Sequence, residues 1–126
     1  MKYSVYKQDR YTVFQLEEEN MNSVVAPDLK SELLAMQIQG VNNLILDVSK
    51  VKHTDSAGLS AMLQVGSSWN TSGVFVVSAN PYIRNLIDIT HLDRVLFIAN
   101  TVQEAVELVF KEELRRQQED NSDETS

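Results

Sequence analysis

The stretches Leu44-Ile45-Leu46-Asp47-Val48 and Asp55-Ser56-Ala57-Gly58-Leu59 decide how this chain folds. The first is a short apolar run broken only by Asp47, which is typical of a buried strand. After the second, apolar and small residues recur at helical spacing as far as Trp69. Ser56 is therefore expected where the connection from a central strand enters a helix. There it would be the N-cap, and its hydroxyl would accept a hydrogen bond from a free backbone N–H. An exposed hydroxyl at the positive end of a helix dipole is also a suitable position for a phosphate.

Length and composition limit the classes of protein to consider. A chain of 126 residues suits one domain with a hydrophobic core that needs no disulfides. The absence of cysteine excludes disulfides, thiol catalysis and thiolate metal sites. The two histidines, His53 and His91, argue against a zinc site. We expect no metal and no cofactor.

The charge balance bears on partners and location. Eleven basic and 18 acidic residues give a net charge of -7, which argues against nucleic acid and anionic membranes as partners. The start, Met1-Lys2-Tyr3-Ser4, has no apolar signal region, and no apolar run approaches the roughly 18 residues of a membrane span. A cytoplasmic protein without direct membrane binding is expected.

The end of the chain differs from the rest. Residues 117–126 contain no apolar side chain and several carboxylates. Such a segment cannot bury surface, so it is predicted to be an acidic disordered tail. The folded domain is then expected to occupy residues 1–116.

The first part of the chain predicts a hairpin and a helix. Residues 3–7 and 11–16 are rich in strand formers, and a polar turn separates them. A helix follows, with Asn22 or Ser23 as its cap and Gly40 at its end. Residues 44–48 then form the apolar strand.

The second part alternates helices and strands. A helix over 57–69 and an apolar strand over 74–77 make a βαβ unit, whose strands should be parallel. Asn80-Pro81 starts another helix, residues 96–98 form a strand, and a capping box over 101–104 opens a last helix. The expected fold class is α/β: a mixed sheet, with an opening hairpin and then parallel strands, packed with about four α-helices.

At Asp55-Ser56-Ala57-Gly58-Leu59 the sequence resembles the STAS family, the sulfate-transporter and anti-sigma-factor-antagonist domains. The likeness extends upstream through Leu46-Asp47-Val48-Ser49 and downstream through Asn80-Pro81 and Leu86-Ile87-Asp88. The order of elements matches over roughly residues 3–115. The resemblance implies the STAS fold and a binding module without enzymatic activity or catalytic residues.

The resemblance also implies a phosphorylation switch at Ser56. In bacterial anti-sigma factor antagonists, an anti-sigma factor that is also a serine kinase phosphorylates the serine of this motif, and a metal-dependent serine phosphatase removes the phosphate. The unphosphorylated form binds the anti-sigma factor and frees the sigma factor. The partner-binding residues implied here are Asn20, Met21, Asn22, Asp55, Ser56, Gly58 and Leu59.

Two positions depart from the family pattern. Many antagonists have Ser or Thr after the phosphorylated serine, but Ala57 stands here, so Ser56 is the single candidate acceptor. The family often has Gly-Glu-Leu-Asp before the first helix. This chain has Glu19-Asn20-Met21-Asn22, in which an uncharged Asn replaces the Asp.

Other interpretations stay open at this point. Ser56 could be only a helix cap, Asp55 could position Ser56 or end the strand, and Gly58 could simply allow close helix–sheet packing. Asp47 is expected to face solvent or to bond backbone. An alternative function is an unphosphorylated structural subunit of a lipid-transport or other signalling assembly. A serine hydrolase lacks support, because the chain has no Gly-x-Ser-x-Gly elbow.

Overall fold

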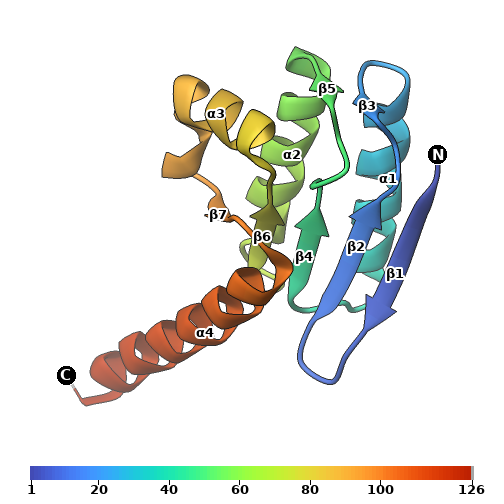
Figure 1. Cartoon of the computed structure of the whole chain (residues 1–126). Coiled ribbons are helices and arrows are strands. Elements are labelled where there is room, and N and C mark those ends of the chain that lie inside the picture. Colours follow the sequence, from blue (N-terminus) through green and yellow to red (C-terminus); the bar gives the residue numbers. More distant parts are fainter. Residues whose placement is uncertain (126) are drawn as a thin grey trace.

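The computed structural model describes residues 1–125, and their side chains as far as Glu119. A five-stranded sheet lies between two helical layers (Figure 1). Its strand order is β1-β2-β4-β6-β7, with β1 antiparallel to β2 and every other neighbouring pair parallel. The bounds are β1 Tyr3–Lys7, β2 Thr12–Leu16, β4 Leu44–Asp47, β6 Phe75–Ser78 and β7 Phe97–Ala99. The predicted hairpin and parallel strands are confirmed.

Helices cover both faces of this sheet. Three of them pack on one face: α1 Val25–Ile38, α2 Ser56–Trp69 and α3 Pro81–Thr90. The fourth, α4 Val102–Thr125, crosses the opposite face (Figure 1). A 3-10 turn, Leu92–Arg94, links α3 to β7. Four helices on a mixed sheet confirm the predicted fold class. None of the helices in the described part of the chain is long and apolar enough to cross a membrane.

The alternation of side chains along the central strands builds two separate cores. Leu44 and Leu46 of β4 point towards α1, α2 and α3, whereas Ile45 between them points towards α4. Successive residues of a strand face opposite sides of the sheet, so a continuous apolar run is what a strand covered on both faces requires. Trp69 and Met62 of α2 are fully buried in the first core.

Short local signals set several helix ends as predicted. The side chain of Asn80 accepts the N–H of Ile83 at 2.9 Å, with Pro81 at the first helical position of α3. Gly40 follows α1 with φ of +97°, a conformation that favours glycine. At α4 the hydroxyl of Thr101 accepts the N–H of Glu104 at 3.1 Å. The Glu104 carboxylate accepts the N–H of Asn100 rather than that of Thr101.

The carboxyl end of the chain differs from expectation. A disordered tail was expected from Gln117, but α4 continues as helix to Thr125. The segment contains no Gly or Pro, and Arg115 pairs with Glu119 one turn on at 2.9 Å. Helix propagation needs no burial once the helix is nucleated, because each added residue gains a backbone hydrogen bond. Ser126 lies outside the described residues, and the domain boundary at residue 116 stays a prediction.

Candidate partner-binding site

Ser56 is the first residue of α2 and its side chain is exposed. The predicted N-cap role belongs instead to Asp55, whose Oδ1 accepts the N–H groups of Ala57 at 2.9 Å and Gly58 at 3.2 Å. A carboxylate is the stronger acceptor, and its charge interacts favourably with the helix N-terminus. No hydrogen bond of the Ser56 hydroxyl occurs within residues 1–119, so this hydroxyl is available to another molecule.

A second, two-stranded parallel sheet lies beside Ser56. It pairs β3 Asn20–Met21 with β5 His53–Thr54, in segments that were expected to be loops (Figure 1). The hydroxyl of Thr54 donates to the carbonyl of Met21 at 2.7 Å. The N–H groups of Lys52 and His53 both donate to the carbonyl of Glu19. His53 is exposed.

Gly58 and Met21 form the floor of the site rather than its surface. Met21 has no exposed surface, and Gly58 is also buried. A Cβ added at Gly58 would overlap the Oγ1 of Thr54 and the carbonyl oxygen of Met21. Gly58 therefore lets α2 approach the small β3–β5 sheet closely, which agrees with its structural interpretation. Both residues were expected to contact a partner, but in this conformation they lie beneath the surface.

The remaining predicted contact residues reach the surface to different degrees. Asn20 and Asp55 are exposed, whereas Asn22 and Leu59 are half-buried. The Oδ1 of Asn22 accepts the N–H groups of Val24 at 3.0 Å and Val25 at 3.2 Å, so it closes the turn that starts α1. This local bond needs an oxygen acceptor but not a charge.

Three further exposed side chains lie at or near the starts of α1, α2 and α3. Val24 at the start of α1 is 75% exposed. Tyr82 at the start of α3 is also exposed, and its ring meets that of His53 edge to face, with centroids 6.3 Å apart. Ser60, one turn after Ser56, is exposed as well. A partial signal for Val24 was present in the sequence, because only one of two adjacent valines at a helix start can face the core.

A shallow groove of about 310 Å³ runs between α1 and α2, next to Ser56. Its apolar floor includes Ala26 and Ala61, and its rim carries Lys30, Ser60 and Gln64. No cluster of His, Asp and Glu among the described residues could hold a metal ion. The exposed serine, the exposed apolar side chain of Val24 and this groove suit contact with another protein.

Asp47 lies at the carboxyl end of β4 and is buried. Its Oδ1 accepts the N–H of Ser49 at 3.0 Å and its Oδ2 accepts the side-chain amide of Gln15 at 3.1 Å. The prediction that Asp47 bonds backbone is confirmed, and its solvent-facing alternative is wrong.

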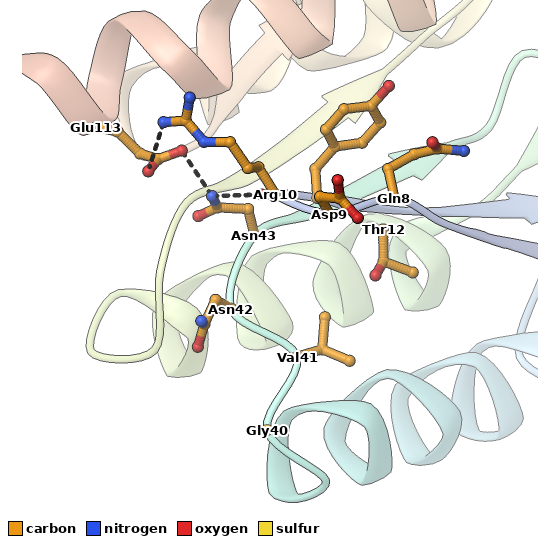
Figure 2. Close-up of a pocket in the computed structure, with 10 residues that line it drawn as sticks. Gln8, Asp9, Arg10, Thr12, Gly40, Val41, Asn42, Asn43 and Glu113 are labelled. Atoms are coloured by element: carbon orange, nitrogen blue, oxygen red, sulfur yellow. Dashed lines mark hydrogen bonds and ion pairs between the residues drawn. The ribbon is translucent and has the colours of Figure 1, made fainter.

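The pocket in Figure 2 lies at the other end of the sheet, where the β1–β2 turn meets the loop between α1 and β4. The amide of Asn43 donates to the Arg10 carbonyl and to Glu113 of α4, each at 2.9 Å, and its oxygen accepts the N–H of Val74. Arg10 also pairs with Glu113 at 3.4 Å. This network ties α4 to the sheet, so we interpret the pocket as structural.

Comparison with known proteins places this geometry in a family context. A family model described as the STAS domain matches residues 2–105. A Thermotoga maritima protein, provisionally named an anti-sigma factor antagonist, is 34% identical over 73 residues. The matched part is 56% of this chain and spans 65% of that relative's length.

Solved structures show similar folds. The crystal structure of an anti-sigma factor antagonist from Mycobacterium paratuberculosis superposes with a TM-score of 0.78 at 25% identity, covering 86% of this chain and 92% of the other. The Bacillus cell fate determinant SpoIIAA in its phosphorylated form has a TM-score of 0.64 at 17% identity, covering 86% of this chain and 99% of the other. The second likeness concerns the fold alone.

Proposed function

We propose, from the premise that this chain belongs to the STAS domain family, that it is an anti-sigma factor antagonist controlled by phosphorylation of Ser56. It acts by binding and not by catalysis. Unphosphorylated, it binds an anti-sigma factor that has serine kinase activity. Phosphorylated, it releases that partner until a metal-dependent serine phosphatase removes the phosphate. This cycle would operate in the cytoplasm.

One observation carries the proposal: Ser56, at the first position of a long helix, has an exposed hydroxyl that makes no hydrogen bond to the side chains or backbone described for residues 1–119. A serine that served only as the cap of this helix would accept hydrogen bonds from backbone N–H groups of its first turn. Asp55 accepts those bonds instead. A kinase can therefore reach Ser56 without unfolding the helix. The names of the Thermotoga and Mycobacterium relatives support the same function.

The switch follows from charge. Phosphorylation of Ser56 adds about -1.5 to -2 charges at neutral pH. The added phosphate lies next to the Asp55 carboxylate, which already occupies two of the free N–H groups of α2. The anion is therefore less well neutralised within this protein than at an uncapped helix end, and a partner surface shaped to the hydroxyl meets concentrated negative charge. A loss of about 3 kcal/mol would weaken binding roughly a hundredfold.

The contact surface we propose centres on Ser56 and excludes the two buried floor residues. Asn20 and Asp55 flank it, Leu59 adds a half-exposed apolar edge, and Asn22 holds the start of α1 in place. Val24 adds the largest apolar exposure nearby. This surface combines an apolar anchor with a polar rim, as protein interfaces commonly do.

A binding titration tests the proposal. The partner kinase is captured from the native cells, and its affinity is measured for wild type, Ser56→Ala and Ser56→Asp. The alanine variant should bind as tightly as wild type, and the aspartate variant at least about tenfold more weakly. Ser67→Asp is the matched control, because Ser67 is exposed near the far end of the same helix and does not line the groove beside Ser56. Binding by Ser56→Asp equal to wild type would contradict the proposal, and so would equal losses in both aspartate variants.

Intact-mass measurement of the protein from its native cells tests the modification itself. We expect one added phosphate on wild type and none on Ser56→Ala. If wild type carries no phosphate under growth and stress conditions and co-purifies with a membrane complex, the protein is instead an unphosphorylated subunit of a transport assembly.

A further inference from the structure

The strand β1 forms an open edge of the main sheet and carries exposed apolar side chains. Among residues 1–125 it pairs only with β2, and no strand of that part of the chain lies on its outer side (Figure 1). Tyr3, Val5 and Tyr6 are 38%, 38% and 50% exposed. An uncovered edge of this kind is a template for adding another strand.

The direction of the free backbone groups follows from the β1–β2 ladder. Glu17 donates to the Lys2 carbonyl and Gln8 to the Tyr11 carbonyl, so the even-numbered residues of β1 form the hydrogen-bonded pairs with β2. In an antiparallel ladder these pairs alternate with pairs whose backbone groups point away. The N–H and C=O groups of Tyr3, Val5 and Lys7 therefore point outwards at the edge.

The outward residues are complementary to a second copy of themselves. In an antiparallel pairing centred on Val5, Val5 meets its own counterpart and Tyr3 meets Lys7 of the other copy. This register engages all three outward residues and places no two lysines opposite each other, since Lys2 then faces Gln8. It brings about six backbone hydrogen bonds, two for each of the three pairs.

Charge favours the same register. Tyr3, Val5 and Lys7 share the sheet face that α1 covers, because they pair with Leu16, Phe14 and Thr12 of β2. The ring of Tyr3 stacks on that of Phe14, with centroids 4.6 Å apart, and Glu32 of α1 lies close enough to raise the pKa of the Tyr3 hydroxyl. Lys7 of the other copy, directly opposite Tyr3, has the length and the charge to pair with Glu32.

We propose that two copies of this chain associate through antiparallel pairing of their β1 strands, with Lys7 of each copy beside Tyr3 and Glu32 of the other. The result is one continuous sheet of ten strands around a two-fold axis. The interface is small and partly polar, so the association is weak and depends on concentration. It uses none of the residues around Ser56, and its failure would leave the proposed function untouched.

A charge swap tests the register. Sedimentation equilibrium at protein concentrations from about 10 μM to about 1 mM covers the range of weak association. The mass of wild type should rise from 14.3 kDa towards twice that value. Lys7→Glu and Glu32→Lys should each stay monomeric, and the double variant should regain dimer formation. Lys111→Glu is the matched control, an equal charge change on an exposed residue of α4, and it should behave as wild type.

Val5→Pro gives an independent test, because the N–H it removes points outwards and is not part of the β1–β2 ladder. Its melting temperature and circular dichroism show whether the fold is retained, and its mass should stay that of a monomer. A wild-type mass that stays at 14.3 kDa at the highest concentration would overturn the proposal. A dimer that survives Lys7→Glu, Glu32→Lys and Val5→Pro would overturn it as well.

Discussion

Replacing Gly58 with alanine should destabilise the protein even though alanine is the better helix former. In a helix interior the change gains about 1 kcal/mol. However, the new Cβ overlaps the Oγ1 of Thr54 and the carbonyl oxygen of Met21. The Met21 oxygen belongs to the backbone, so it cannot move aside as the end of a side chain can. Overpacking of this kind costs about 1–3 kcal/mol, and losing the Thr54–Met21 hydrogen bond costs about another 1 kcal/mol. The net loss of unfolding free energy should be about 1–3 kcal/mol.

Gly66→Ala on the same helix is the matched control. It gains the same helix preference, but its Cβ meets the Cδ2 of Leu96, the end of a side chain that can move. We expect a stability within about 1 kcal/mol of wild type.

Urea unfolding followed by the fluorescence of Trp69, the single and fully buried tryptophan, measures both variants. A loss of about 2 kcal/mol would lower the melting temperature by roughly 6–10 °C in a domain of this size. Hydrogen exchange should also speed up at the amides of Lys52 and His53, which bond the Glu19 carbonyl in the small sheet. If Gly58→Ala proves as stable as Gly66→Ala, the close approach of α2 to the β3–β5 sheet is not what fixes glycine there.

Three other substitutions test the network around the sheet. Asp55→Ala should cost about 1 kcal/mol in urea unfolding, because it removes the N-cap of α2. Asn43→Ala should cost about 2–4 kcal/mol in the same assay, because it leaves the buried N–H of Val74 without an acceptor and releases two further bonds. Glu112 is buried, and its hydrogen bond to Arg115 holds the pKa of its carboxyl below the ordinary value, with Arg116 adding to the effect. A carboxyl whose pKa is lowered by folding stabilises the protein above its unfolded-state pKa, and this stabilisation is lost as the pH falls through its folded-state pKa. Glu112→Gln removes this carboxyl. As the pH is lowered, the melting temperature of the variant should therefore fall less steeply than that of wild type.

Much of the fold follows from local sequence. The apolar runs over 44–48 and 74–77, the turn between residues 7 and 11, and the Asn80-Pro81 helix start each depend on neighbours a few residues away. Backbone preference and hydrophobic period act at that range, so these elements lie within a residue or two of their predicted bounds. The motif at Ser56 was likewise visible in the sequence, together with its place at the start of a helix.

Two adjacent residues could have been the N-cap of α2, and the backbone conformation decides between them. Asp55 and Ser56 are both good N-cap residues, and their order alone does not say which adopts the extended backbone. In the structure Asp55 does, with φ of -122° and ψ of -173°, because Thr54 is held by pairing with Met21, 33 residues earlier in the chain. The cap role of Asp55 in turn leaves the Ser56 hydroxyl free.

By itself, the sequence determined the strands of the main sheet, the four helices, their order and the serine that stands at the start of α2. Only the tertiary structure decided that Met21 and Gly58 lie beneath that serine, that Asp47 is buried, and that Asn20 and His53 meet in a second sheet. Burial and pairing between distant segments depend on how the helices pack on the sheet. That packing is settled by the sum of many contacts across the whole chain, and no short stretch of residues encodes it.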